Sequence, residues 1–481
     1  MKVCIIVEGS YPYVAGGVSS WVQMLLDRFS DIEFVIWSIA TSRDEMSEMK
    51  YVLPDNVKEI RTIYLNDIKF KPVHSNIKLN KHEHEALKSL IMGQDYLNIQ
   101  WLEILELIKN HKAQLIDILM SHDFFEIAVE LYNAEYSRTI FNDNLWNLRS
   151  MFFPLLSTLV EDFSEADLYH SASTGYAGLL GSVASYVYKK PFIITEHGIY
   201  TLEREEEIIK SDWVKGDFKK NWINFFYRIS AIAYHQADQV ISLFESNRTL
   251  QIEMGCPPEK TRVIPNGVDV ESYSTHLLDS SLKGIGEANK TLSKKIRVGA
   301  VARLVPIKDI KTMILAFATA MQKVDNLELF ILGPTEEDVA YHQEVLSLID
   351  DFDLKNVSIL GRVDVKTYLP TFDMMLLTSI SEGQPLAVLE GMAAGIPQIC
   401  TNVGSCKELL FGMSNDELGH CGLIVPVMDI EKIASAIEVL ALDESLRNQM
   451  GKIGYERVKA TYQKKDFLAT YEALYHSIIE A

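Results

Sequence analysis

Hydrophobic positions in the first part of the chain alternate between two periods. Residues 3–7 form a short apolar run that ends at Glu8, and after a glycine-containing turn the apolar positions follow helical spacing. The helical positions are Val18, Trp21, Val22, Leu25 and Leu26. Further buried-strand patterns lie at 34–39, 192–195 and 239–243. Strands that alternate with helices predict an α/β fold with a parallel, doubly wound sheet.

A second series of strand patterns follows a polar, aperiodic stretch at 274–295. Its members are residues 297–302, 327–332, 357–360, 374–377 and 398–401. We therefore predict two Rossmann-like domains, 1–292 and 293–464, with a cleft between them. The periodic stretch at about 465–481 predicts a last helix that packs back on the first domain.

Between about 75 and 165 strand patterns are absent, and apolar residues recur at spacings of three and four, as at Trp101, Leu105 and Ile108. This pattern predicts a helical insertion, either structural or in contact with an acceptor or a partner. His74, His82 and His84 lie there in a lysine-rich stretch without cysteine or carboxylate partners at metal-ligand spacing. We interpret them as solvated loop histidines and predict no metal site.

The charge balance restricts the possible partners. Lys plus Arg number 46 and Asp plus Glu 66, so the net charge of the 481 residues is −20. Such a chain repels nucleic acid and anionic membranes at long range, so we expect no nucleic-acid partner and a locally basic pocket for any anionic ligand.

Cysteine usage and hydropathy indicate a compartment. The five cysteines have no C-x-x-C spacing, which favours a reducing environment; they are Cys4, Cys256, Cys400, Cys406 and Cys421. No run reaches the about 18 apolar residues of a spanning helix. A cytoplasmic protein is predicted.

The stretch 381–395 carries the strongest candidate chemistry. It follows a predicted strand, so Glu382 and Gly383 are expected in the turn at the carboxyl end, where doubly wound sheets bind ligands. Pro385 suits the first turn of a helix whose free N–H groups can hold an anion or hydroxyls. Helical geometry would place Glu382 and Glu390 on similar faces about 12 Å apart. A solvated glutamate and a helix cap explain the pattern equally well.

A basic pair follows another predicted strand. Arg303 can bind phosphate through its planar fork and Lys308 as a point charge, in a loop before a predicted helix. The alternative is two surface cations neutralised by neighbouring acids.

Two weaker candidates lie in the first domain. Gly16 and Gly17 would let a ligand approach the backbone near a helix start. His197 follows the strand pattern at 192–195, where a purely structural histidine is the more common case. The chain lacks both G-x-G-x-x-G in this loop and a P-loop motif, which removes the usual support for NAD or P-loop nucleotide sites.

Together these segments resemble the GT-B glycosyltransferases of family four, which share E-x7-E, the basic pair and a Gly-Gly first loop. Residues 264–269 and 361–363, which include Arg362, also resemble that family, and the likeness covers nearly the whole chain outside 75–165. Residues 8–21, 379–386 and 403–409 are similar to the narrower PelF type, which acts in Pel exopolysaccharide synthesis.

The resemblance implies roles for single residues. Arg303 and Lys308 would hold the donor diphosphate, Glu390 the ribose hydroxyls, and Glu382 with the backbone of Gly383 and Gln384 the donor sugar. Gly17 would face the diphosphate and His197 the sugar or acceptor. The implied catalytic set is Arg303, Lys308, His197 and Glu382, and the implied donor-binding set is Gly16, Gly17, Arg303, Lys308, Arg362, Glu382, Gly383, Gln384, Pro385, Leu386 and Glu390. Many relatives have an aromatic residue at Gln384 and an aspartate at Gly198.

The resemblance implies a retaining, metal-independent transfer of a hexose from a UDP-sugar to a growing exopolysaccharide, without a cofactor. The expected partners are the UDP-sugar, the polysaccharide acceptor and membrane-bound synthesis or export proteins, with the chain held at the inner face of the membrane through a protein partner. Two alternatives stay open. One is another GT-B enzyme, an epimerase or phosphorylase, and the other is a non-catalytic assembly subunit.

Overall fold

The structure is a computed structural model, and it describes residues 1–43, 48–65, 77–93, 98–111, 115–160, 162–278, 295–413 and 416–480. The chain forms two compact units. Unit 1 comprises Met1–Val263 together with Glu472–Ala481, and unit 2 comprises Ile264–Tyr471.

Unit 1 is built on a seven-stranded parallel sheet with the order β3-β2-β1-β4-β5-β6-β7. The strands are β1 (Lys2–Glu8), β2 (Glu33–Ala40), β3 (Val57–Tyr64), β4 (Leu168–Ser171), β5 (Phe192–Glu196), β6 (Gln239–Ser242) and β7 (Thr261–Val263). The chain runs outward from β1 to β3 and returns to β4 on the other side of β1. The strand order therefore reverses between β1 and β4, where doubly wound sheets bind ligands.

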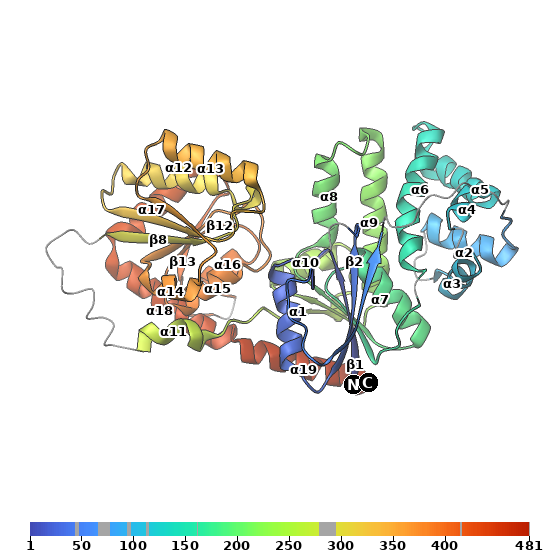
Figure 1. Cartoon of the computed structure of the whole chain (residues 1–481), viewed down its shortest axis with the longest axis horizontal. Coiled ribbons are helices and arrows are strands. Elements are labelled where there is room, and N and C mark those ends of the chain that lie inside the picture. Colours follow the sequence, from blue (N-terminus) through green and yellow to red (C-terminus); the bar gives the residue numbers. More distant parts are fainter. Residues whose placement is uncertain are drawn as a thin grey trace. The chain divides into compact units, whose positions relative to one another are not determined.

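Helices cover this sheet (Figure 1). They are α1 (Gly17–Arg28), α7 (Gly175–Tyr188), α8 (Tyr200–Lys210), α9 (Gly216–Gln236) and α10 (Glu245–Glu253), with a short η4 (Pro258–Lys260). Helix α7 packs on β1, β4 and β5, and α9 packs on α7. The small residues of α7 are buried, and a Cβ on Gly181 would collide with the Phe192 ring, so glycine permits close helix-to-strand packing here.

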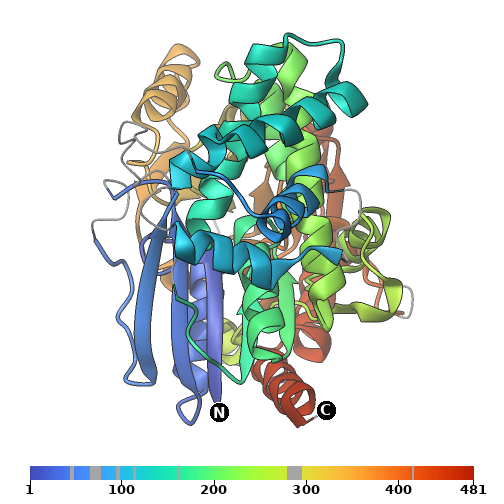
Figure 2. The same cartoon turned by 90° about the vertical axis from the view of Figure 1, so that its right-hand side faces the viewer.

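The helical periodicity of the stretch between β3 and β4 corresponds to a series of helices. These are α2 (Lys81–Met92), α3 (Trp101–Asn110), α4 (Leu115–Met120), α5 (His122–Leu131), the π-helical turn η3 (Tyr132–Tyr136) and α6 (Phe141–Thr158). Helices α3 and α6 contact α7, and Figure 2 shows the helices α2–α6 layered over the side of unit 1 on which α7 lies. One hydrophobic core runs from these helices into the sheet, so they stabilise unit 1 directly.

Unit 2 contains a six-stranded parallel sheet with the order β10-β9-β8-β11-β12-β13. Its strands are β8 (Ile296–Val301), β9 (Leu327–Leu332), β10 (Val357–Gly361), β11 (Met374–Leu377), β12 (Gln398–Thr401) and β13 (Gly422–Val425). The strand order reverses between β8 and β11. The predicted architecture of two Rossmann-like, doubly wound parallel sheets is confirmed.

The helices of unit 2 are α11 (Val270–Leu278), η7 (Pro306–Lys308), α12 (Ile310–Met321), α13 (Val339–Asp351), α14 (Val365–Tyr368), η8 (Leu369–Thr371), α15 (Leu386–Ala393), α16 (Cys406–Phe411), α17 (Ile430–Leu442) and α18 (Glu444–Thr461). The last helix, α19 (Lys464–Glu480), enters unit 1 at Glu472. There the Tyr475 hydroxyl lies 2.7 Å from His170 Nδ1 in β4.

One detail of the predicted linker differs from the structure. Residues 274–278 belong to α11, whereas the sequence pattern predicted an aperiodic stretch from 274 onward. Most of the remaining linker, 279–294, and with it the predicted boundary between 292 and 293, lies outside the described residues. None of the described helices has the length and apolarity that crossing a membrane requires.

Candidate functional site

The basic pair and Glu382 lie on the two loops where the strand order of unit 2 reverses. The loop after β8 carries Arg303 and Lys308, and the loop after the neighbouring β11 carries Glu382. Lys308 Nζ donates to Glu382 Oε1 at 2.5 Å, and both side chains are mostly buried. The Ser379 hydroxyl donates to the same oxygen at 2.5 Å. The lysine therefore keeps further N–H donors for a ligand, and its position is fixed by the carboxylate.

Hydrogen bonds connect the two loops directly. The Thr378 hydroxyl lies 3.1 Å from the carbonyl oxygens of Lys308 and Asp309, and the Ile380 N–H donates to the Ile307 carbonyl at 2.9 Å. Asp309 begins α12 with a φ of 47° and accepts the Thr312 N–H at 3.4 Å. The sequence order strand, basic loop, helix thus becomes a rigid edge that presents Lys308.

The two arginines of the predicted donor set pair with one acidic segment. Arg303 donates to Glu337 Oε2 at 2.7 Å, and Arg362 donates to Glu336 Oε1 at 2.8 Å. The Arg303 side chain is 46% exposed and that of Arg362 is 62% exposed. Exposed pairs contribute no more than about 1 kcal/mol, so a phosphate can displace either glutamate.

The helix after Glu382 begins later than the spacing argument assumed. Pro385 is the N-cap of α15, and only the stretch from Leu386 to Ala393 is helical. Glu382 lies before the helix, so the prediction that Glu382 and Glu390 share a helical face is wrong. The prediction that Pro385 stands at a helix start is confirmed.

Two side chains of this stretch have protein partners. Glu390 Oε1 accepts the Tyr273 hydroxyl at 2.8 Å, and burial raises the pKa of Glu390 while the Tyr273 hydrogen bond and Lys366 oppose the rise. Gln384 is buried, and its Oε1 accepts the Asn266 N–H at 2.6 Å. Gln384 Oε1 therefore holds the 264–269 loop, and the backbone role that the resemblance implies stays a prediction.

Gly404 packs closely against the backbone of the Glu382 loop. It has a φ of +50°, and a Cβ there would collide with the carbonyl oxygens of Glu382 and Gly383. The adjacent Ser405 N–H donates to the Gly383 carbonyl at 2.9 Å. The 403–409 motif, which served only as a mark of resemblance, thus has a physical role in positioning Glu382.

Replacing Gly404 by alanine is expected to lower the free energy of unfolding by about 3 kcal/mol, because backbone atoms cannot move aside as a flexible side chain can. Gly361→Ala is the matched control, since Gly361 has a φ of +67° and open space around its Cβ position. The control is expected to cost only the about 1–2 kcal/mol of a left-handed conformation. Side-by-side calorimetry measures both, and equal losses would contradict the collision.

In unit 1 the Gly-Gly loop leads into α1. Gly16 is the N-cap and Gly17 the first helical residue, and nothing lies within 4 Å of the Cβ position of either glycine. The space at both Cβ positions is therefore open, and the approach of a ligand to this helix start stays a prediction.

His197 lies at the end of β5 and lines a cavity of about 170 Å³ beside Glu8 and Ser10. Its ring packs edge-on against Trp21 at 4.9 Å, and burial lowers the pKa of His197 to about 4. The imidazole is therefore neutral at neutral pH. A Cβ on Gly198 would collide with the Glu203 carboxylate. A carboxylate from α8 thus lies beside the position where the family resemblance implies an aspartate.

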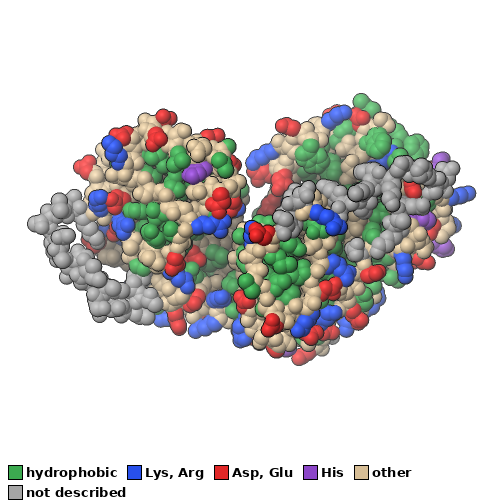
Figure 3. Space-filling model, in the orientation of Figure 1, with side chains coloured by type: hydrophobic (Ala, Val, Ile, Leu, Met, Phe, Trp, Pro, Cys, Tyr) green, Lys and Arg blue, Asp and Glu red, His purple; other side chains and the backbone are tan. Residues whose placement is uncertain are grey.

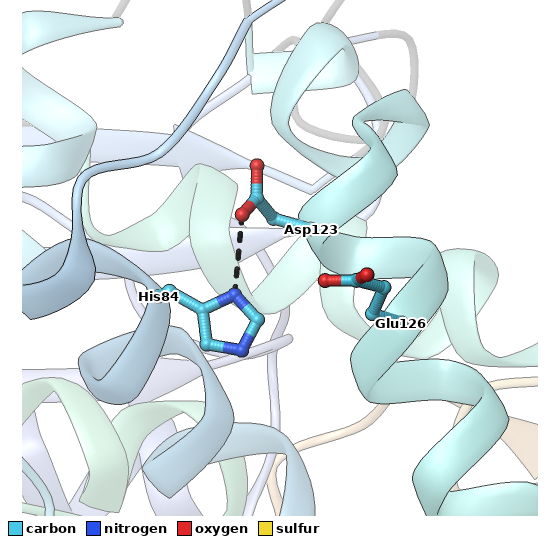
Figure 4. Close-up of side chains that lie close together, drawn as sticks. All are labelled: His84, Asp123 and Glu126. Atoms are coloured by element: carbon cyan, nitrogen blue, oxygen red, sulfur yellow. Dashed lines mark hydrogen bonds and ion pairs between the residues drawn. The ribbon is translucent and has the colours of Figure 1, made fainter.

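Two of the three histidines singled out in the helical stretch are helical residues. His82 and His84 lie on α2, which corrects the sequence-based interpretation, whereas His74 lies outside the described residues. His84 Nδ1 is 3.2 Å from Asp123 Oδ1 on α5, and Glu126 lies one turn further along α5 (Figure 4). These groups could hold a cation. Asp123 Oδ2 also accepts the Leu79 N–H at 3.1 Å, so helix packing already accounts for this arrangement.

Comparison with protein families assigns both parts of the chain. Residues 1–259 match the family described as "Domain of unknown function (DUF3492)", and residues 286–457 match "Glycosyl transferases group 1". The chain is a group 1 glycosyltransferase with an N-terminal DUF3492 domain. Lys308, Glu382 and Glu390 all lie in the glycosyltransferase part.

Curated relatives of this glycosyltransferase act on sugars. It is 26% identical over 333 residues to the capsular polysaccharide biosynthesis glycosyltransferase CapM of Staphylococcus aureus, covering 68% of this chain and 81% of CapM. It is also 26% identical over 412 residues to the UDP-Gal:alpha-D-GlcNAc-diphosphoundecaprenol alpha-1,3-galactosyltransferase of Escherichia coli, covering 79% and 92%.

Solved structures share the fold of the glycosyltransferase. Anabaena Alr3699/HepE in complex with UDP superimposes with a TM-score of 0.57 and 15% identity, over 99% of this chain and all of the other. Sucrose-phosphate synthase from Thermosynechococcus elongatus gives 0.60 and 17%, over 100% and 99%. At these identities the likeness supports the fold alone.

The structure adds candidate residues that sequence reasoning did not single out. Glu203, Arg204 and Tyr200 line the same cavity as His197, and Glu8 was only part of a quoted motif. Their signal was available in the segment from Thr195 onward, where several ionisable residues follow a strand end. Without the packing of α8 on α9 that segment reads as an exposed, charged helix.

Proposed function

We propose that this glycosyltransferase is a retaining enzyme that transfers a hexose from a UDP-sugar to a growing exopolysaccharide, and that it is of the PelF type. The observation that carries the proposal is the Lys308–Glu382 pair at the point where the strand order of unit 2 reverses, with Arg303 on the same loop. Cations there suit a diphosphate, and a carboxylate suits sugar hydroxyls.

The relatives support the choice of donor and product. CapM is named for capsular polysaccharide biosynthesis, and the E. coli relative is named for UDP-Gal. The PelF assignment rests on the segments 8–21, 379–386 and 403–409. Of these, 403–409 positions the Glu382 loop through Gly404 and Ser405.

We propose that no resident metal or other cofactor is needed. Negative charge grows on the leaving diphosphate as the sugar bond breaks, and Lys308, Arg303 and backbone N–H groups at helix starts can stabilise it. Lys308 keeps donors beyond the one used by Glu382, and Arg303 is half exposed, so both can turn toward phosphate oxygens.

UDP is expected to stabilise the protein by about 2.7 kcal/mol at 100 times its dissociation constant, with or without EDTA. Thermal unfolding with UDP, GDP and ADP measures the preference, and sugar transfer in EDTA measures the independence from metal. Loss of transfer on chelation, with recovery on adding Mg²⁺ or Mn²⁺, would refute the metal-free proposal. Lack of any UDP shift would refute the donor assignment.

We further propose that a membrane-bound synthesis or export protein holds the enzyme at the inner face of the membrane. Exposed apolar side chains support a docking surface, since Ile140 is 69%, Trp146 50% and Trp213 67% exposed. Lys215, just before α9, contacts Asp143 near the start of α6, and Lys219 of α9 donates to the Ile209 carbonyl near the end of α8. Figure 3 shows hydrophobic side chains gathered over this part of the unit.

Trp146→Ser and Trp213→Ser are expected to release the protein from membrane fractions of cells that contain its partners, while the wild type does not float with anionic liposomes. A net charge of −20 disfavours direct attraction to anionic lipid. Leu442→Ser, at a 76% exposed position of unit 2, is the control and should stay bound. Strong liposome binding by the purified protein would contradict the partner model.

A further inference from the structure

Helices α2 and α5 bring a histidine and two carboxylates to one point in unit 1. His84 lies on α2, whereas Asp123 and Glu126 lie on α5 at a spacing of three residues, which places them on one face of that helix. One nitrogen or oxygen atom from each of the three side chains lies within 4.8 Å of the other two (Figure 4). The three side chains therefore surround one small volume between the two helices.

Helix packing explains only part of this arrangement. Asp123 stands in the first turn of α5, where acids are common, and its Oδ2 accepts the Leu79 N–H at 3.1 Å. These contacts place Asp123, but they do not require Glu126 to approach the same point. One turn further along both helices, a simple ion pair joins α2 to α5, with Lys88 Nζ 2.8 Å from Glu130 Oε1.

No strong cation balances the charge of the cluster. Among the residues that the structure describes, neither Asp123 nor Glu126 forms an ion pair with a lysine or an arginine. Their partners are imidazoles, since His84 Nδ1 lies 3.2 Å from Asp123 Oδ1 and His122 Nδ1 lies 3.6 Å from Glu126 Oε1. Two carboxylates that approach each other repel, and a divalent cation between them would neutralise both.

The donor atoms select the class of cation. Mg²⁺ and Ca²⁺ prefer oxygen ligands alone, whereas imidazole together with carboxylates suits Zn²⁺. Zinc bonds of about 2.0–2.2 Å place tetrahedral ligands about 3.3–3.5 Å apart, so the ligand atoms have to approach one another by about 1 Å. Rotation of the Glu126 side chain, which is 57% exposed, supplies this movement. His122 precedes Asp123 on α5 and is 80% exposed, so its ring can turn toward the same point.

We propose that His84, Asp123 and Glu126 bind Zn²⁺ with His122 as the fourth ligand, and that the ion ties α2 to α5. The ion takes the place of the hydrogen bond between His84 and Asp123. Sequence spacing could not indicate this site, because 39 residues separate these two ligands. The cluster contains none of the residues assigned to sugar transfer, so the inference goes beyond the proposed function and leaves transfer in EDTA as expected.

Titration calorimetry on the full chain, stripped of metal with EDTA and then freed of EDTA, tests the inference with Zn²⁺ as the probe. Glu126→Gln is expected to weaken Zn²⁺ binding at least about tenfold, because even groups that only orient a zinc ligand contribute about 10–100-fold. The exposed Glu126 side chain has no packing role, so this variant should stay folded. His84→Gln should weaken binding at least as much, and Mg²⁺ should not compete with Zn²⁺.

His82→Gln and Glu130→Gln are the matched controls. His82 is exposed on α2, and Glu130 pairs with Lys88 outside the cluster, so both variants should bind Zn²⁺ as the wild type does. Thermal unfolding without metal checks the fold of each variant, and Zn²⁺ should raise the midpoint of the wild type more than that of Glu126→Gln.

Two results would overturn the inference. One is no Zn²⁺ binding by the folded wild type. The other is equal affinity in the wild type and in Glu126→Gln, which would mean that any bound zinc lies at other histidines. Neither result bears on sugar transfer, which is measured separately in EDTA.

Discussion

Replacing Lys308 by alanine is expected to lower kcat/KM for sugar transfer by at least about thirtyfold, equivalent to at least about 2 kcal/mol of transition-state stabilisation. Charge develops on the leaving diphosphate, and Lys308 is the mostly buried cation of its loop. The substitution also leaves Glu382 without its ion-pair partner, so negative charge remains where the diphosphate has to bind.

Lys311→Ala provides the matched control for this prediction. Lys311 lies three residues further on in α12 and pairs with Glu344 at 2.6 Å, where the two side chains are 42% and 59% exposed. Its removal should leave both rate and stability nearly unchanged. If Lys308→Ala turned over any suitable sugar donor at the wild-type rate, Lys308 would have no part in stabilising the leaving group.

Arg303→Ala is expected to cost at least about 2 kcal/mol of transition-state stabilisation as well, but with little change in the stability of the fold. Arg303 is 46% exposed and paired with Glu337, so its removal changes stability little. Its loss should therefore appear in kcat/KM alone, whereas Lys308→Ala should also alter the stability of the loop. Measuring thermal unfolding beside kinetics for both variants separates the two cases.

The hydrophobic pattern predicted strands that form a continuous apolar run. Residues 327–332 and 374–377 coincide with β9 and β11, because a continuous apolar run has few alternatives to a central parallel strand. The edge strand β3 was missed since its sequence alternates with charged residues and it is only partly buried. β4 was missed because four residues that include His170 form no recognisable run.

The candidate site was predictable where a side chain lies on the loop that follows a strand. Lys308 and Glu382 were found this way, and the neighbouring positions of β8 and β11 bring them together. What the sequence could not supply was packing between distant segments. Gln384 Oε1 accepts the Asn266 N–H, and Gly404 packs against the carbonyl oxygens of Glu382 and Gly383. Both facts depend on loops that meet only after the sheet has formed.

The cavity in unit 1 was also beyond what the sequence could predict. Glu8 and Glu203 can be read from the sequence, but no local sequence pattern reports how far a carboxylate is buried or which groups it contacts. A side chain at Gly198 would collide with the Glu203 carboxylate, and Arg204 pairs with Glu207 at 2.8 Å. Charge at a site therefore has to be counted after folding, whereas net charge along the chain only restricts the class of partner.

Lowering the pH from neutral to about 5 is expected to remove about 2 kcal/mol of stability through His170 alone. Its pKa is lowered to about 3, mainly by burial and also by His197, against about 6.5 in the unfolded chain. Below pH about 6.5, His170 binds a proton in the unfolded chain but stays neutral in the folded protein. The stabilising effect is thus complete above that pH and is lost progressively as the pH falls toward about 3.

Other buried groups titrate in the same range, so the effect of His170 must be isolated by comparison. His197, with a pKa of about 4, acts in the same direction, whereas the raised pKa values of Glu8, Glu196 and Glu203 favour the folded state as the pH falls. These contributions cancel between two variants that differ only at His170.

His170→Gln keeps polar atoms near the Tyr475 and Thr195 hydroxyls, which lie 2.7 and 2.8 Å from the two ring nitrogens. The variant is expected to be less stable than the wild type at neutral pH, because the ring also packs edge-on against Trp21. Its stability should fall by about 2 kcal/mol less than that of the wild type between neutral pH and about pH 5. Urea unfolding of both proteins at both pH values measures how much free energy of unfolding each loses as the pH falls. Equal losses in the two proteins would mean that His170 is protonated in the folded state, which the contacts from Trp21, Thr195 and Tyr475 argue against.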